Sequence, residues 1–490
     1  MNLFPRPVLD ALAADPGRTA FQHGTRAVSA DELLGLTGRV ERRLREAGLG
    51  PGSGVAVAAA TSPETYAAHL AAHALGCRVA ALRPGWSAAQ LAHVLREPVD
   101  ALIADAATMT PELAGAGARL LSLGPLPGAA DLLRPGPAAP PEVLARPDDV
   151  ARLTFTSGST GLPKACAQTY RAHSLAYQDW PPVLAELMTR FERCLVHGTL
   201  ASPVMMTYAG RCLVAGGTVV VPGPGEDLAA ALGRHAVTAA MMPPPRLGAL
   251  LLALGVGGPP GLRALVLGGA PAGPSLLAAA AERLGPVIWQ GYGQAEAGVI
   301  TMLTPADVAA GRLTSVGRPL PGVRLSLRDR DERPVGPGEV GEVWVRSPHR
   351  MAGYWRDPEG TREVLRDDGW LRTRDLGRLD GDGMLHLTGR TRDVIIVNAE
   401  VCYAGAVEAV LAGHPAVEQA FVVGAPDPVT GEAVHAYVVP AGRARVSRDD
   451  LAALVRDALG EAAVPRTVTT LAEAPVNEAG KPDKSRLKPG

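Results

Sequence analysis

The chain has 490 residues, of which 47% are hydrophobic, so it is too long for one ordinary hydrophobic core and apolar enough to bury two or more domains. Its formal net charge is -1 and it contains no block of Lys or Arg, which argues against binding to nucleic acid or to an anionic membrane. Small molecules or proteins are the expected partners.

The cysteines and the N-terminal segment indicate the cellular compartment in which the protein is expected. Five cysteines are widely scattered, without a Cys-x-x-Cys pair or a histidine set at metal-binding spacing, so reduced thiols are expected. The N-terminal segment lacks the apolar region of a signal peptide. The longest apolar runs, such as 247–256, are interrupted by glycine and too short to cross a bilayer. The sequence predicts a cytoplasmic protein without membrane insertion.

Short β-rich runs alternate with Ala- and Leu-rich stretches of helical length in the first part of the chain. The predicted strands include 55–60, 218–221, 262–267 and 287–290, and a helix is predicted over 275–284. This alternation is typical of an α/β architecture with parallel sheets.

The composition and the pattern of predicted elements change three times further along the chain. A Pro-, Gly- and Ala-rich connector at 133–147 is expected to be a surface linker. Beyond residue 317, turns between short strands predict a β-rich subdomain, and after Asp393 a strand–helix–strand pattern predicts a small α+β domain. We therefore expect an α/β fold with a large N-terminal domain over 1–392 and a small α+β C-terminal domain over 393–490.

A loop rich in glycine and hydroxyl groups follows a predicted strand at 152–156 and ends at Lys164. In such a loop, backbone N–H and side-chain O–H groups converge on phosphate oxygens, and the lysine adds a countercharge. The spacing is not that of a Walker motif, because Pro163 stands where a glycine would precede the lysine. We interpret the loop as a phosphate cradle, with a flexible Ser/Gly turn as the alternative.

Lysine is scarce in this chain. Only four of the 48 basic residues are lysines, namely Lys164 and three in the last ten residues. Positions that keep lysine are therefore expected to need a compact ammonium rather than a guanidinium. Lys481 follows a glycine, which permits close backbone approach. Lys484 and Lys488 have no such support and are expected to be solvated.

The loop and several later segments resemble, in order, the signature motifs of the adenylate-forming superfamily. That superfamily includes acyl-CoA synthetases, acyl- and aryl-AMP ligases, firefly luciferase and peptide-synthetase adenylation domains. The resemblance covers nearly the whole chain, and the ordered set is more specific than any one motif. The later segments are Leu267-Gly268-Gly269-Ala270-Pro271, Gly291-Tyr292-Gly293-Gln294-Ala295-Glu296, 369–377, 389–393 and 477–484.

The resemblance implies a nucleotide site for ATP. Tyr292 is expected to stack on adenine, Asp375 to accept hydrogen bonds from the ribose hydroxyls, and Arg390 to contact the ribose or a phosphate. A turn residue is the alternative for Asp375, and a surface ion pair is the alternative for Arg390. The implied nucleotide-contacting residues are Thr156, Ser157, Gly158, Ser159, Thr160, Gly161, Gly268, Gly269, Ala270, Tyr292, Gly293, Gln294, Ala295, Asp375 and Arg390.

The resemblance also implies three catalytic residues and a hinge. Glu296 is expected to hold Mg2+, a hard cation that suits a carboxylate, and Lys164 to face the polyphosphate. Lys481 is expected between the substrate carboxylate and the α-phosphate, with a solvated tail lysine as the alternative. In the family the small domain rotates, and Asp393 is the expected hinge residue.

The pocket for the acid is expected around 193–208, 241–245 and Gln290. In the family, a histidine or an aromatic residue near His197 flanks the acyl group. Ordinary core residues are the alternative for these positions. The predicted pocket residues are His197, Met205, Tyr208, Met242 and Gln290.

The expected function is ATP-dependent adenylation of a carboxylic acid through an acyl-AMP intermediate, followed by transfer to an acceptor. Coenzyme A is the first expectation for the acceptor and an acyl carrier protein the next. Asn398 and Ala399 replace two glycines of a loop with which family members approach the pantetheine arm, so an amine or nitrite stays open.

Two further departures from the family motifs concern the nucleotide site. Ala295 replaces the usual threonine, and Arg374 replaces a glycine and adds a cation near the expected nucleotide. A non-catalytic relative that binds nucleotide or acyl ligands is the alternative from another class. Retention of Lys481 beside the other motif residues argues against that alternative.

Overall fold

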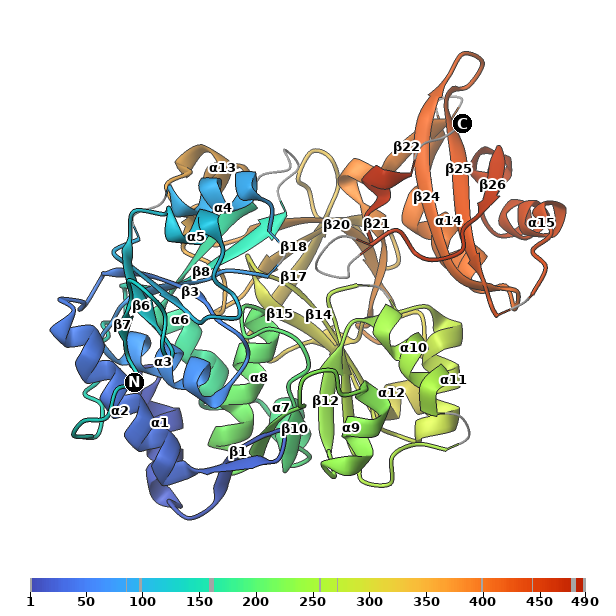
Figure 1. Cartoon of the computed structure of the whole chain (residues 1–490). Coiled ribbons are helices and arrows are strands. Elements are labelled where there is room, and N and C mark those ends of the chain that lie inside the picture. Colours follow the sequence, from blue (N-terminus) through green and yellow to red (C-terminus); the bar gives the residue numbers. More distant parts are fainter. Residues whose placement is uncertain are drawn as a thin grey trace.

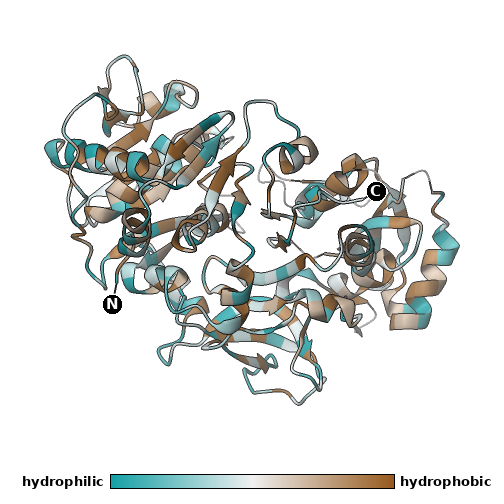
Figure 2. Cartoon of the chain, turned by 90° about the horizontal axis from the view of Figure 1, so that it is seen from below, coloured by the Kyte–Doolittle hydropathy of each residue, from teal (hydrophilic) through white to brown (hydrophobic). Residues whose placement is uncertain are grey.

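The computed structural model places a large N-terminal part and a small C-terminal domain beside it (Figure 1). The residues that it describes are 2–84, 86–96, 99–157, 163–254, 257–270, 272–397, 400–442, 444–476 and 482–487. Apolar residues gather on the strands and the inner helix faces, and hydrophilic residues lie along the outer helices (Figure 2).

One large sheet of the N-terminal part is mainly parallel, as predicted. Its order is β16-β15-β14-β13-β12-β10-β11-β1-β2. The predicted strand 287–290 runs on to Gln294, so the Tyr-Gly-Gln motif lies on a strand. The strands are β1 (Thr19–His23), β2 (Arg26–Ser29), β10 (Arg193–Leu195), β11 (Thr218–Val221), β12 (Ala239–Met242), β13 (Ala264–Leu267), β14 (Ile288–Gln294), β15 (Gly298–Leu303) and β16 (Arg318–Pro319).

A second sheet carries the glycine- and hydroxyl-rich loop. Its order is β19-β9-β8-β4-β3-β5-β6-β7, and β8 and β9 form an antiparallel hairpin on either side of that loop. The strands are β3 (Gly54–Ala58), β4 (Arg78–Ala81), β5 (Ala101–Ala104), β6 (Arg119–Ser122), β7 (Ala130–Asp131), β8 (Val150–Ser157), β9 (Pro163–Thr169) and β19 (Gly353–Tyr354).

Helix α3 (Pro63–Ala74) belongs to the core that joins these two sheets. All of its residues except Glu64 are buried, and residues of both sheets share one apolar cluster with it. A helix that is buried on nearly all sides needs such surroundings. The other helices are α1 (Arg6–Ala14), α2 (Ala30–Glu46), α4 (Ala88–Leu95), α5 (Pro111–Ala114), α6 (Tyr170–Ser174), α7 (Pro182–Met188), α8 (Pro203–Val214), α9 (Leu228–Arg234), α10 (Pro244–Leu254), α11 (Pro274–Leu284), α12 (Pro305–Ala309) and α13 (Pro358–Val364).

The predicted β-rich subdomain is an antiparallel sheet. Its strands, in the order of pairing, are β17 (Arg324–Arg328), β18 (Gly341–Arg346), β20 (Leu371–Leu379) and β21 (Leu385–Arg390). A single turn of 3-10 helix, Thr391–Asp393, leads from β21 to the C-terminal domain. The predicted domain boundary at residue 393 falls in this turn, and it stays a prediction.

The C-terminal domain has its own apolar cluster. Helix α14 packs on the long β24–β25 hairpin, and it also touches the large domain, where Ser275 donates a hydrogen bond to the Ala412 carbonyl at 3.3 Å. Among the described helices, none has the length and the apolar run that a membrane crossing requires. The elements are β22 (Val394–Val397), β23 (Glu400–Tyr403), α14 (Ala404–Ala412), β24 (Val417–Asp427), β25 (Gly431–Pro440), α15 (Arg448–Leu459) and β26 (Thr467–Thr470).

Candidate active site

The β8–β9 hairpin fixes both ends of the predicted phosphate loop. Thr156 lies opposite Lys164 in the ladder, and its hydroxyl donates a 3.4 Å hydrogen bond to the Lys164 carbonyl. Ser157 pairs with Pro163 one step further along. The predicted contacts of Gly158, Ser159, Thr160 and Gly161 lie outside the described residues. The hairpin therefore presents Lys164 directly beside the start of the loop.

Two residues that the sequence analysis did not identify hold Lys164. Its Nζ lies 3.1 Å from Oδ2 of Asp357 and 5.0 Å from the centre of the Tyr354 ring. Asp357 also caps α13 by accepting a hydrogen bond from the Gly360 N–H at 2.8 Å. That hydrogen bond, followed by Lys164, lowers the pKa of the Asp357 carboxyl. Asp357 is therefore an anion at neutral pH.

Tyr354 joins this lysine to the predicted metal ligand. Its hydroxyl donates a 3.0 Å hydrogen bond to Oε1 of Glu296. Burial and the nearby Glu296 carboxylate raise the Tyr354 pKa, so the hydroxyl keeps its proton. The Met351 N–H donates to the Glu296 carbonyl at 2.7 Å, and β19 pairs with β9. Residues 351–357 therefore connect Glu296 and Lys164, which lie far apart in the sequence.

The three residues predicted at the adenosine lie together. The Tyr292 hydroxyl donates to Oδ2 of Asp375 at 2.7 Å, and Nε of Arg390 lies 3.0 Å from Oδ1. Asp375 and Arg390 are direct cross-strand neighbours on β20 and β21. Asp375 thus lies within a strand, which contradicts the turn-residue alternative. Burial is the main cause that raises the pKa of Tyr292, and the nearby Asp375 carboxylate raises it further.

Close backbone packing explains the glycines near this cluster. A Cβ on Gly293 would lie 2.3 Å from the Gly298 carbonyl oxygen of the neighbouring strand. Gly269 has a φ of +83°, which favours glycine, and a Cβ on Gly268 would lie 3.4 Å from the Gly291 oxygen. Ala270 follows this turn and is partly buried.

Two glutamine side chains of strand β14 each have one buried polar atom that is unpaired among the described residues. They are Oε1 of Gln290 and Nε2 of Gln294, neither of which has a hydrogen-bond partner within the described part of the chain. Buried amide groups normally find partners. Ala295, which follows Gln294, is partly buried against the central apolar cluster and offers no hydrogen bond from its side chain. Gln290 and Gln294 are therefore suited to contact a polar ligand group.

Arg374 takes a backbone conformation that favours glycine. Its φ is +62°, in the left-handed region. Its guanidinium pairs with Glu363 of α13, with 2.7 Å between Nη2 and Oε2. The cation that the sequence analysis expected near the nucleotide is therefore engaged by an exposed carboxylate.

The predicted acid-pocket residues do not form one cluster. Tyr208 is buried and stacks on Phe191 with 5.5 Å between ring centres, whereas Met242 is buried in a different cluster, with α9, α10 and α11. These two positions fit the alternative of ordinary core residues. Met205 is partly buried against the central core.

His197 is partly buried and accepts a hydrogen bond at Nδ1 from Nη1 of Arg246. Burial, followed by Arg246, lowers the His197 pKa, so the imidazole is neutral at pH 7. An imidazole in this state presents an Nε2–H donor.

The C-terminal lysines differ from expectation in one respect. Lys484 is not solvated, because its Nζ lies 2.7 Å from Oε1 of Glu408 and 3.4 Å from Oδ2 of the predicted hinge residue Asp393. Burial raises the pKa of Glu408, and Lys484 supplies the compensating charge. Lys481 and Lys488 lie outside the described residues, although Val476 and Pro482, on either side of 477–481, form an antiparallel bridge.

Comparisons with known proteins agree with this arrangement. The model of the AMP-binding enzyme family matches residues 9–355, and that of the AMP-binding enzyme C-terminal domain matches residues 406–481. A medium/long-chain-fatty-acid–CoA ligase, FadD8 of Mycobacterium tuberculosis, is 35% identical, with 90% of this chain and 82% of the relative covered. A feruloyl-CoA synthase of Amycolatopsis is 33% identical over 96% of each chain.

Among solved structures, amide bond synthetase McbA from Marinactinospora thermotolerans superposes with a TM-score of 0.89 and 38% identity over 98% of each chain. The o-succinylbenzoate CoA synthetase of Bacillus subtilis, solved with its acyl-adenylate intermediate, has a TM-score of 0.85 and 26% identity over 100% of this chain and 99% of that one. The chain belongs to the AMP-binding enzyme family, within the adenylate-forming superfamily, and is an AMP-forming ligase.

Proposed function

We propose that this ligase adenylates a carboxylic acid with ATP and then transfers the acyl group to an amine, forming an amide. In the first step a carboxylate oxygen bonds to the α-phosphorus and pyrophosphate leaves. In the second step the amine nitrogen bonds to the acyl carbon, the bond to AMP breaks, and the nitrogen loses its extra proton. The observation that carries the adenylation step of the proposal is the convergence of Lys164 and Glu296 on the segment 351–357.

The proposed nucleotide site uses the clusters around Lys164 and Asp375. The Asp375 carboxylate accepts a hydrogen bond from Tyr292 and pairs with Arg390. We propose that the same carboxylate accepts hydrogen bonds from the ribose hydroxyls when ATP is bound. Lys164 is half exposed in its ion pair with Asp357, which a polyphosphate of higher charge can displace.

Glu296 is the proposed Mg2+ ligand. Its hard carboxylate suits Mg2+, and no group of three or more His, Cys, Asp or Glu suited to a metal occurs among the described residues. A single carboxylate, that of Glu296, fits a cation that ATP phosphates also bind, rather than one held in an all-protein cage. When bound, Mg2+ would neutralise phosphate charge. Tyr354 orients the carboxylate, and Lys481 is proposed to neutralise charge between the acid and the α-phosphate.

Two observations favour an amine as the acceptor. The amide bond synthetase matches this chain along nearly its whole length and at 38% identity, above the 35% and 33% of the two CoA ligases named above. The second observation is that Asn398 and Ala399 replace the two glycines of the motif loop that serves the pantetheine arm in the family. Coenzyme A is the second candidate, because the FadD8 and feruloyl-CoA relatives use it.

Mass spectrometry of complete reactions separates the two acceptors. The protein is incubated with ATP, Mg2+ and a library of aliphatic and aromatic acids, with an amine panel, with coenzyme A, or with neither. The proposal predicts amides that appear together with AMP. A thioester formed faster than any amide would overturn the amine assignment and leave adenylation intact. Failure of every acid to release pyrophosphate would overturn the adenylation itself.

A further inference from the structure

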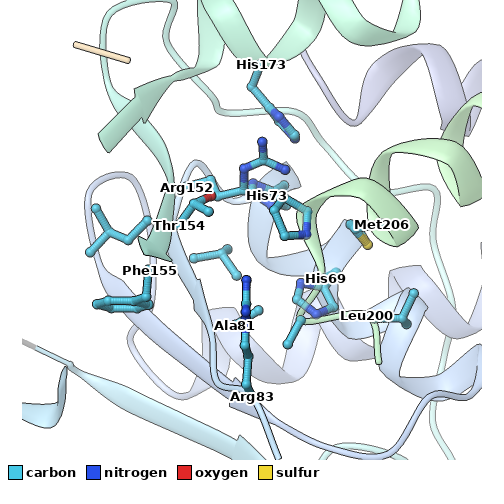
Figure 3. A pocket seen from close by; sticks show the side chains of 14 residues that line it. His69, His73, Ala81, Arg83, Arg152, Thr154, Phe155, His173, Leu200 and Met206 are labelled. Carbon is cyan, nitrogen blue, oxygen red and sulfur yellow. The ribbon is translucent and has the colours of Figure 1, made fainter. Parts of the chain in front are cut away.

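A small, partly open cavity lies beside β8, the strand that leads into the proposed phosphate loop. Its volume is about 20 Å3, which is room for one water molecule or one monatomic ion. Strands β4 and β8, helices α3, α6 and α8 and the segment before α8 surround it. The side chains in Figure 3 that matter here are Arg83, Arg152, His69, His73 and His173.

Arg152 brings an uncompensated charge to this cavity. Its Nη2 donates a 2.8 Å hydrogen bond to Oε1 of Gln168, whose own Nε2 donates to the His349 carbonyl at 3.0 Å. The amide oxygen of Gln168 is therefore fixed toward Arg152, but it carries no charge. The Nε and Nη1 atoms of Arg152 are buried and have no hydrogen-bond partner in the residues that the structure describes.

A guanidinium keeps its charge in proteins, so this charge has to be balanced by something else. Over the described ranges, neither Arg152 nor Arg83 has an ion pair with a carboxylate. Buried charges without a counter-ion are strongly unfavourable. Burial lowers the pKa of both arginines, which reflects the same lack of compensation.

The histidines add hydrogen-bonding groups but no negative charge. Burial lowers the pKa of His69 to about 4 and places those of His73 and His173 well below the usual value, so all three rings are neutral at pH 7. His173 is 2% exposed, and its Nε2 is buried without a partner among the described residues. Figure 3 shows the Arg152 guanidinium between His73 and His173.

We propose that this cavity binds one small monovalent anion of halide size, chloride under ordinary conditions, on the unpaired N–H groups of Arg152 and on His173. A halide accepts hydrogen bonds only and brings one negative charge, which matches the unpaired Nε and Nη1 donors of Arg152 and its positive charge. A water molecule needs acceptors as well as donors and leaves the charge unbalanced.

The bound anion connects β8 to α3 and α6, because Arg152 lies on β8 and the histidines lie on the two helices. It therefore stabilises the strand that ends at Thr156. Leu200 and Met206 of the lining lie in the range 193–208 where the acid is expected, but the anion site does not rest on the identity of the acid or of the acceptor. Failure of the anion test would therefore leave the proposed reaction standing.

Crystals of the full chain soaked in sodium bromide test the site directly. The proposal predicts an anomalous bromide peak in the cavity within hydrogen-bonding distance of Arg152. A peak of water-like density without anomalous signal would overturn it.

Thermal unfolding in solution supplies a second test with a matched control. At constant ionic strength, replacing gluconate by chloride is expected to raise the Tm of the wild type by about 1–3 °C. Arg152→Gln removes the charge and is expected to lose this response, whereas Arg171→Gln, an exposed arginine paired with Asp148, keeps it. An equal chloride response in Arg152→Gln would overturn the proposal. If that variant does not fold, the bromide result decides alone.

Discussion

The hydroxyl of Tyr354 lies 3.0 Å from Oε1 of Glu296, and the ring of the same tyrosine lies 5.0 Å from Nζ of Lys164. One side chain thus contacts both the proposed Mg2+ ligand and the lysine of the phosphate loop. Its strand, β19, pairs with β9, whose second residue is Lys164. We infer that Tyr354 is a positioning residue for both groups.

Tyr354→Phe distinguishes the contribution of the hydroxyl from that of the aromatic ring. The variant keeps the contact with Lys164 and loses the hydrogen bond to a carboxylate, which contributes about 1.5–3 kcal/mol. We expect kcat for acid-dependent pyrophosphate release to fall about 10-fold or more and the Mg2+ concentration for half-maximal rate to rise. Tyr437→Phe, in the C-terminal domain, is the control. An unchanged Mg2+ dependence in Tyr354→Phe would mean that the hydroxyl does not orient Glu296.

Arg374→Gly is expected to raise stability. The left-handed backbone at φ +62° costs a non-glycine residue about 1 kcal/mol, and glycine removes that cost. The ion pair with Glu363 is half exposed and contributes less than about 1 kcal/mol. Arg374→Ala loses the ion pair without relieving the backbone, so it is the matched control and should be less stable than Arg374→Gly. Urea unfolding measures the difference, and equal stability of the two variants would show that the backbone is not strained.

Stability is expected to fall as the pH drops below about 6.5, because the cavity histidines are neutral in the fold. The folded pKa of His69, lowered mainly by burial, is about 4. The unfolded chain therefore binds a proton that the fold does not, and the stabilisation present above about pH 6.5 is lost on the way to about pH 4. For His69 the loss amounts to about 3 kcal/mol.

Urea unfolding at pH 7.5 and pH 5 measures how the free energy of unfolding depends on pH. His69→Gln cannot titrate at this position and should show a shallower dependence on pH than the wild type. A wild type with the same stability at both pH values would contradict the account.

Much of the fold could be predicted from local patterns. Strand 218–221 has the predicted limits, and the predicted helix 275–284 differs from α11 by one residue at its start, because turn residues bound both elements. The motifs predict that Tyr292, Asp375 and Arg390 share one site, and the structure brings their side chains together.

Other features depend on tertiary contacts that no local pattern reports. Tyr354 and Asp357 lie after a β-rich subdomain and reach Lys164 only because β19 joins the sheet of β9. Lys484 was expected to be solvated, yet buried Glu408 makes it part of an ion pair. Met242 and Tyr208 are apolar residues of the kind that line a binding pocket, so the sequence alone could not distinguish them from pocket residues. Tertiary packing places them in two different apolar clusters.

The role of Lys481 follows from the resemblance to the family alone, and a kinetic assay tests it most directly. The measurement is acid-dependent exchange of labelled pyrophosphate into ATP by the wild type and by Lys481→Ala, with ATP binding measured in parallel. The account predicts exchange in the wild type only when a substrate acid is present, and a loss of about 100-fold or more in Lys481→Ala with ATP affinity nearly unchanged. Undiminished exchange in Lys481→Ala would contradict it.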